Sequence, residues 1–289
     1  MYSILEVKHL TKEYPTLKLD DVSFSVPKGT IMGLIGENGA GKSTVIKAML
    51  DLIKKDAGQV TFWGQELSSN PKQLKEDIGV VFDSINFHGA LTPTEIGNIC
   101  NTAYRQWNGD AYRNFLSKFN LPMDKKLKTF SNGMKMKLNI SIALSHRAKL
   151  LILDEPTNGL DPVMRDVILE LLLDFVQDEE HSILISSHIT TDLEKIADYI
   201  LFLHEGKLEF CKPKDELRYD YGILRCGTAA FEALDKTKGD ILAYRKTDLQ
   251  WDVLVSNKAK AKKNYPNVIV DDATIDDILL LYIKGEHVS

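Results

Sequence analysis

The sequence is poor in cysteine and has no long apolar run. Its three cysteines, Cys100, Cys211 and Cys226, are far apart and form no CxxC pair. We therefore expect neither a disulfide framework nor a zinc site, but three buried or inert thiols in a reducing cytosol. The longest apolar runs, such as Tyr199 to Leu203 and Ile278 to Ile283, fall far short of the roughly 20 residues that a membrane-spanning helix needs.

An excess of one charge is also missing. The 36 basic side chains face 41 acidic ones, which gives a net charge of -5. Because nucleic acid and anionic lipid favour a basic surface, we expect no nucleic-acid partner, and an anionic ligand must be held by a local site. The first residues, MYSILEVKHLTKEY, are interrupted by charge and lack the small-residue cleavage pattern of a secretory signal.

The sequence does contain several short apolar runs, each of which ends at polar residues or a glycine loop. The 289 residues, 44% of them apolar, suffice for one large α/β domain and a small appendage. Runs that alternate with helical segments are typical of a mostly parallel sheet with helices on both faces, and such sheets bind ligands at their strand C-terminal ends. The runs are Ile31 to Ile35 before a glycine loop, Ile78 to Phe82 before Asp83, Leu150 to Leu153 before Asp154, and Ser182 to Ser187 before His188.

The remaining patterns predict how the chain is divided. Leu17 to Val26 alternates apolar and polar residues, as a half-exposed antiparallel strand of a smaller β layer should. Helical patterns alone fill residues 84–145, which predicts an all-helical insertion into a mixed α/β domain over residues 1–217. Residues 218–289 are expected to form a small accessory α/β domain.

Several helix starts carry capping signals. Thr92 to Glu95 and Thr191 to Glu194 have the spacing of capping boxes, and Asn70-Pro71 and Asp161-Pro162 place a capping side chain before a proline at the first helical position. We therefore expect helices to begin at these four places.

The segment Gly36 to Ser43 matches the phosphate-loop pattern GxxxxGK[ST] between a predicted strand and a predicted helix. Glycines allow backbone N–H groups to converge on phosphates, and the helix N-terminus adds partial positive charge. Lys42 is expected to reach the β- and γ-phosphates, and the Ser43 hydroxyl to ligate Mg²⁺. The ATP-binding residues expected here are Gly36, Asn38, Gly39, Ala40, Gly41, Lys42, Ser43 and Thr44.

Two carboxylates follow the strand Leu150 to Leu153. Asp154 is expected to hold Mg²⁺, mainly through a coordinated water, as the equivalent acid does in phosphate-loop ATPases. Glu155 is then placed to orient or deprotonate the attacking water, a role typically worth about 10² to 10⁴ in rate. This pair predicts that the chain hydrolyses ATP.

The residues Phe130-Ser-Asn-Gly-Met134 precede this acidic strand by one helix. With the phosphate loop, this arrangement resembles the nucleotide-binding subunit of an ATP-binding cassette (ABC) transporter, where LSGGQ stands at the helix start. The resemblance implies that Ser131, Asn132 and Gly133 face the γ-phosphate of ATP bound on an opposing copy. Asn132 tolerates a left-handed backbone almost as glycine does, whereas Met134 lacks the amide of glutamine, so we expect weaker or differently gated dimerisation.

The same resemblance implies roles for four further residues. His188 is similar to the switch histidine that touches the γ-phosphate, and Tyr14 to the aromatic residue that stacks on adenine, although a core or edge tyrosine is the alternative. Asp161 resembles the loop residue that crosses the dimer interface, and it also caps the next helix. Asp83 stands where the family usually has a glutamine that ligates Mg²⁺, and we expect its carboxylate to bind Mg²⁺ directly or through water.

By resemblance, the chain is a hydrolase subunit with ATP and Mg²⁺ as cofactors. It would pair with a second copy at the cytoplasmic face of the membrane, and the pair would drive export through separate integral membrane subunits, with the insertion near Phe87 to Tyr104 passing on the movement. The SNGM signature is most similar to the signatures of ATP-binding subunits that serve exporters of antimicrobial or toxin peptides. Two alternatives stay open: a soluble ABC ATPase acting on ribosomes, DNA or cluster assembly, and an ATP-gated module without turnover.

Overall fold

The computed structural model describes residues 2–67, 71–84, 86–236 and 240–288. The chain forms two compact units, Met1–Cys211 and Lys212–Ser289. The division falls after Cys211, ahead of the boundary expected after Leu217. The Lys212 ammonium is hydrogen-bonded to Glu216 and lies 5.8 Å from the ring centre of Tyr221.

The first unit contains two sheets. Its strands are β1 (Ser3–Tyr14), β2 (Leu17–Pro27), β3 (Ile31–Ile35), β4 (Ala57–Phe62), β5 (Ile78–Val81), β6 (Leu150–Asp154), β7 (Ser182–Ser187), β8 (Tyr199–His204) and β9 (Lys207–Pro213). A small antiparallel sheet has the order β2-β1-β4, and the main sheet has the order β5-β6-β7-β3-β8-β9. The predicted smaller β layer and mixed α/β fold are thereby confirmed.

The main sheet is parallel from β5 to β8. Strands β3, β6 and β7 are buried along their whole length, which explains why they are continuous apolar runs in the sequence. Their register pairs Ile35 with Ser187 and Asp154 with Ser186. The phosphate loop, the acidic pair and His188 therefore follow strands that end at the same edge of the sheet.

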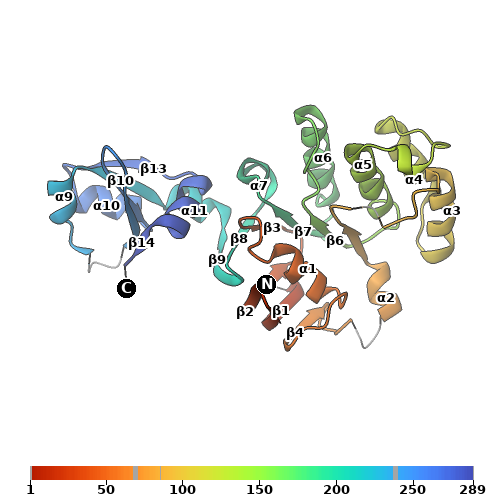
Figure 1. Cartoon of the computed structure of the whole chain (residues 1–289), viewed down its shortest axis with the longest axis horizontal. Coiled ribbons are helices and arrows are strands. Elements are labelled where there is room, and N and C mark those ends of the chain that lie inside the picture. The colour runs from red at the N-terminus through yellow and green to blue at the C-terminus, as the bar shows by residue number, and fades with distance from the viewer. Residues whose placement is uncertain (1, 68–70, 85, 237–239, 289) are drawn as a thin grey trace. The chain divides into compact units, whose positions relative to one another are not determined.

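Helices cover this sheet and form the predicted insertion. They are α1 (Lys42–Met49), α2 (Pro71–Glu76), α3 (Pro93–Ala103), α4 (Gly109–Lys118), the 3-10 helix η1 (Leu127–Thr129), α5 (Asn132–Ala143), α6 (Pro162–Phe175) and α7 (Thr190–Ile196). The described residues between β5 and β6 contain helices but no strand, and Figure 1 shows α3, α4 and α5 grouped together.

Two of the predicted helix caps form. The Thr92 hydroxyl and the Glu95 side chain make the reciprocal bonds of a capping box on α3, and the Asp161 side chain accepts from the Met164 N–H at the start of α6. The box expected at Thr191 is wrong, because α7 begins two residues earlier and Ile189 takes the cap position without a side-chain bond. Asn70 lies outside the described residues.

A buried histidine joins the insertion to the main sheet. Both ring nitrogens of His146 lie 3.2 Å from carbonyl oxygens, one of Ile142 in α5 and one of Ile78 in β5. The ring also stacks on Tyr104 with 4.3 Å between ring centres. Burial lowers the pKa of His146, although the two carbonyls and nearby Asp77 oppose this shift. The imidazole is therefore held mainly in its neutral form.

The three thiols differ in burial. Cys100 and Cys226 are buried, whereas Cys211 is exposed. Burial raises the pKa of Cys100 to about 11, which makes this thiol a poor nucleophile at neutral pH.

In its described residues, the second unit is an antiparallel sheet with four helices. Its strands are β10 (Gly222–Cys226), β11 (Ile241–Lys246), β12 (Trp251–Val255), β13 (Ile269–Asp272) and β14 (Glu286–His287), in the order β13-β10-β12-β11-β14. Its helices are α8 (Lys214–Tyr219), α9 (Thr228–Glu232), α10 (Lys258–Asn264) and α11 (Ile275–Lys284). Helix α11 begins at a capping box made by Thr274 and Asp277.

The core of this unit includes an aromatic stack of Phe231 on Trp251, with ring centres 3.8 Å apart. Across both units, none of the helices that the structure describes combines the length and apolar character required to cross a bilayer.

Candidate functional site

The phosphate loop connects β3 to α1 and is shaped by its glycines. Gly39 and Gly41 have φ angles of +89° and +109°, in the left-handed region that favours glycine. Gly36 is needed for a different reason, since a Cβ there would lie 2.3 Å from the carbonyl oxygen of Leu203. The Gly206 N–H also donates to the Ala40 carbonyl at 3.0 Å. The β8–β9 hairpin therefore supports the loop from one side.

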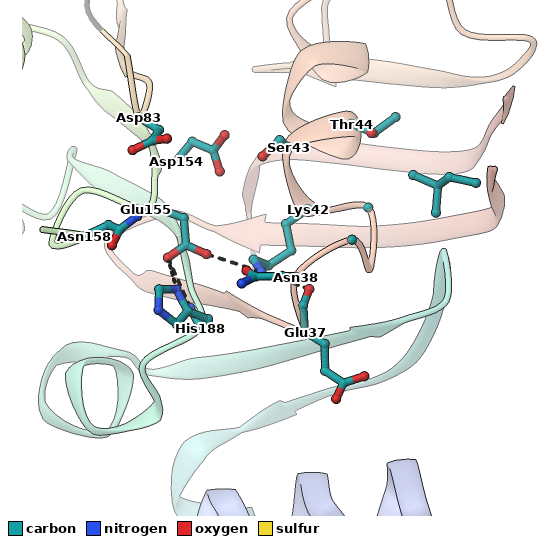
Figure 2. A pocket seen from close by; sticks show the side chains of 13 residues that line it. Glu37, Asn38, Lys42, Ser43, Thr44, Asp83, Asp154, Glu155, Asn158 and His188 are labelled. Atoms are coloured by element: carbon teal, nitrogen blue, oxygen red, sulfur yellow. Dashed lines mark hydrogen bonds and ion pairs between the residues drawn. The ribbon is translucent and has the colours of Figure 1, made fainter. Parts of the chain in front are cut away.

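A cavity of about 410 Å³ opens in front of this loop, a size typical of small-ligand sites. It brings together most of the predicted site residues. Its lining consists of Leu17, Glu37, Asn38, Gly39, Gly41, Lys42, Ser43, Thr44, Asp83, Asp154, Glu155, Asn158 and His188. Figure 2 shows side chains from the phosphate loop, β6 and the end of β7 around one space.

Glu155 lies between two cationic or titratable groups. Its Oε1 is 3.3 Å from Lys42 Nζ and its Oε2 is 2.7 Å from His188 Nδ1, as Figure 2 shows. The His188 backbone N–H also donates to Oε2 at 3.2 Å. Lys42 is only 6% exposed and donates to the Gly36 carbonyl at 2.7 Å. Lys42 and His188 thus both contact the Glu155 carboxylate directly.

Four carboxylates line the cavity. Asp83 and Asp154 lie near the Ser43 hydroxyl (Figure 2), and Glu37 and Glu155 line the same space. Among the described residues, no group of three or more His, Cys, Asp or Glu side chains is arranged to hold a metal by itself. The oxygen donors of Ser43, Asp83 and Asp154 nevertheless fit Mg²⁺, which prefers a few protein oxygens completed by waters and phosphate.

Two phosphate-loop residues and the aromatic candidate are absent from the lining. Gly36 and Ala40 shape the loop through their contacts with the β8–β9 hairpin. Tyr14 is 39% exposed, and the Lys12 ammonium lies 5.2 Å from its ring centre. Adenine stacking on Tyr14 therefore stays a prediction.

The signature residues and the interface aspartate lie apart from this cavity. The Ser131 side chain accepts from the Met134 N–H at 3.2 Å, so Ser131 caps α5, and both it and Asn132 are exposed. Asp161 is exposed at the start of α6. Like Gly133, these residues do not line the cavity. Their predicted contact with a second copy is untested.

Four residues of the site escaped the sequence prediction. Three of them, Leu17, Glu37 and Asn158, line the cavity. Leu17 is expected only as the start of a strand, Glu37 occupies a variable position of the phosphate-loop motif, and Asn158 follows the acidic pair. Ser186 lies behind the lining, where its hydroxyl donates to Asp154 Oδ1 at 2.7 Å. A pair of serines in an otherwise apolar strand, ILISSH, was the available signal for it.

A phosphate loop beside an acidic strand end, on a parallel sheet with a helical insertion, defines a nucleoside triphosphatase of the phosphate-loop class. Comparison with known proteins narrows this class. A model of the ABC transporter family matches residues 19–158. The chain is 32% identical over 219 residues to the ABC transporter ATP-binding protein YtrB of Bacillus subtilis, which covers 75% of each chain.

Other relatives agree. The bacitracin transport ATP-binding protein BcrA of Bacillus licheniformis is 36% identical over 75% of this chain and 72% of its own length. The lantibiotic transport ATP-binding protein SrtF of Streptococcus pyogenes is 37% identical over 73% of this chain and 92% of its own length. A solved ATP-binding subunit of an ABC transporter superposes with a TM-score of 0.66 at 30% identity, covering 75% of this chain and 92% of that one.

The chain therefore belongs to the family of ABC transporter ATP-binding proteins. It is an ATPase subunit, as its phosphate loop, acidic strand end and relatives indicate.

Proposed function

We propose that this subunit binds and hydrolyses MgATP as one of two identical cassettes, and that the cycle drives peptide export through a separate membrane subunit. The contacts of Glu155 with Lys42 and His188 carry the proposal, because a carboxylate beside the phosphate-loop lysine could accept a proton from a water that attacks the γ-phosphate. The names of BcrA and SrtF support the cargo, since bacitracin and lantibiotics are peptide antibiotics.

Each residue then has a defined task. Lys42 and the loop N–H groups bind the β- and γ-phosphates, while Ser43, Asp83 and Asp154 hold Mg²⁺. The cation, when bound, neutralises the charge of the phosphate oxygens. Glu155 accepts a proton from the attacking water, and His188, hydrogen-bonded to that carboxylate, keeps it oriented.

The second copy is proposed to complete the site. Ser131, Asn132 and Gly133 of one cassette would contact the ATP of the other, with Asp161 at the interface, whereas Tyr14 would stack on the adenine bound by its own cassette. The position of the signature residues and Asp161 outside the lining of the cavity supports this division. We further propose that residues 1–217 act as the ATPase domain, that residues 218–289 are accessory, and that the pair works at the cytoplasmic face of the membrane.

Phosphate release by the purified chain tests the catalytic assignment. Glu155→Gln should slow turnover by about 10² or more while nucleotide still binds. Glu180→Gln is a matched control, because Glu180 is an exposed glutamate paired with Lys28 and remote from the cavity. Turnover in Glu155→Gln within twofold of wild type would show that this carboxylate is not the base.

The transport assignment is tested by affinity purification of the tagged chain from detergent-solubilised membranes of its host. An integral membrane protein recovered in a fixed ratio, which raises ATP turnover when added back, is the expected result. Recovery of ribosomes or nucleic acid in its place would favour the soluble alternative.

A further inference from the structure

One buried hydroxyl contacts both acidic residues of the site. Ser186 is fully buried at the end of β7, directly across from Asp154 in the neighbouring strand. Its Oγ donates to Asp154 Oδ1 at 2.7 Å and accepts from the Glu155 backbone N–H at 3.0 Å. A serine hydroxyl has one proton to give and lone pairs to receive, and here it uses both functions on two consecutive residues.

The Glu155 backbone shows why the second contact matters. Glu155 has a φ of +53°, in the left-handed region where a residue with a Cβ is held only by its surroundings. The Glu155 N–H is fixed by the Ser186 hydroxyl and, more weakly, by the Ser186 carbonyl at 3.2 Å. This backbone conformation carries the Glu155 carboxylate to Lys42 and His188.

The first contact determines how the Asp154 carboxylate is presented. Asp154 is 4% exposed, and the Ser186 hydroxyl donates a hydrogen bond to its Oδ1. This bond fixes the rotation of the carboxylate plane in the cavity that Asp154 shares with Ser43 and Asp83. Ser186 itself does not line that cavity, so it acts on the site only through its neighbours.

We propose that Ser186 is a positioning residue that sets the Mg²⁺ affinity of the site by orienting Asp154 and, at the same time, holds Glu155 in its left-handed conformation. This inference rests on the proposed MgATP function. Residues that orient a metal ligand in this way are typically worth about 10- to 100-fold in metal affinity. Because Asp154 is expected to act mainly through water, we expect an effect near tenfold.

The test is the Mg²⁺ dependence of nucleotide binding by the full chain, measured without turnover. A fluorescent ADP analogue is titrated at increasing Mg²⁺, and Mn²⁺ bound to the protein–ADP complex is counted by electron paramagnetic resonance. Ser186→Ala should raise the Mg²⁺ concentration for half-maximal tightening about tenfold, with binding in EDTA unchanged. Ser186→Thr, which keeps the hydroxyl, should stay within about twofold of wild type, and Ser186→Cys should lie between the two.

Ser182 provides a matched control in the same strand. It is fully buried at the opposite end of β7, and its hydroxyl also accepts from a backbone N–H, that of Gly29, at 2.8 Å. Ser182→Ala should lower the melting temperature and leave the Mg²⁺ dependence as in wild type. If Ser186→Ala changed only stability in the same way, the positioning role would be wrong.

The outcomes separate this inference from the function on which it rests. If wild type binds the ADP analogue with no Mg²⁺ dependence, the proposed MgATP site itself is wrong. If ADP binding by wild type depends on Mg²⁺, but the Mg²⁺ requirement does not increase in the order Ser186→Thr, Ser186→Cys, Ser186→Ala, only the role of Ser186 is overturned. The threonine variant keeps a hydroxyl and the cysteine variant puts a weakly hydrogen-bonding thiol in its place. These two variants can therefore still be compared even if Ser186→Ala does not fold.

Discussion

Replacing Thr157 with valine removes one hydroxyl from a buried network while keeping the shape of the side chain. The Thr157 hydroxyl donates to Asp192 Oδ2 at 2.7 Å, and the two residues are 0% and 2% exposed. The nearest cation, Arg165, is less well placed, with its Nε 3.9 Å from the same oxygen. The bond ties the loop after Glu155 to α7, the helix that follows His188.

The structure sets the size of the effect. A hydrogen bond to a charged group contributes about 1.5 to 3 kcal/mol, and the loss is greater when the partner stays buried. Because valine leaves no cavity, we expect Thr157→Val to lower the free energy of unfolding by about 2 to 3 kcal/mol. For a unit of this length, such a loss corresponds to a drop of about 5 to 10 °C in melting temperature.

Urea unfolding of the full chain, followed by circular dichroism, measures this loss. Thr157→Ser keeps the hydroxyl and should recover most of the stability. Thr129→Val is a matched control, because it removes a 2.7 Å hydroxyl bond from an exposed threonine and should change stability by less than about 0.5 kcal/mol. A loss below about 0.5 kcal/mol in Thr157→Val, or no coupling to Asp192→Ala in a double-mutant cycle, would refute the reasoning.

Two further predictions concern stability. Burial lowers the pKa of His146 in the folded chain, whereas in the unfolded chain this histidine has its ordinary pKa of about 6.5. Below about pH 6.5 the unfolded chain therefore binds more protons than the folded chain, and the free energy of unfolding should fall as the pH drops through about 6.5. His146→Gln should flatten this slope between pH 7 and 5 in urea titrations, and an equal slope would contradict the assignment. At Asp161, alanine should lose the cap of α6 and about 1 kcal/mol, whereas asparagine should retain most of it. Equal losses in thermal melts would show that the cap is unimportant. Because asparagine keeps the cap and removes only the charge, ATP-driven pairing that fails in Asp161→Asn would isolate the role of that charge.

The strands of the main sheet could be predicted well because burial on both faces leaves an unbroken apolar signal. Ile31 to Ile35 and Ser182 to Ser187 are strands with the predicted bounds. The run to Phe82 ends one residue early at Val81, and β6 extends to include Asp154. Motif spacing then predicted that the phosphate loop, Glu155 and His188 share one site, and they do.

What the sequence did not reveal depends on neighbours across the sheet. The role of Ser186 follows from its register opposite Asp154, which no local pattern encodes. The left-handed turn at Glu155 was hidden for a related reason, since glutamate has no preference for that conformation and is held there by β7. The capping box at Thr191 failed because the Ser187 hydroxyl accepts from the Ile189 N–H at 2.9 Å and α7 starts earlier.

The backbone at Glu155 also has a consequence for how this protein can change over generations. Its φ of +53° is one at which glycine or asparagine relieves about 1 to 2 kcal/mol. The substitutions that relieve this backbone strain are thus the ones that remove the carboxylate, together with its contacts to Lys42 and His188. Under the proposed function, a copy that no longer needs turnover can give up the strained glutamate, whereas a copy that must cleave ATP has to keep it.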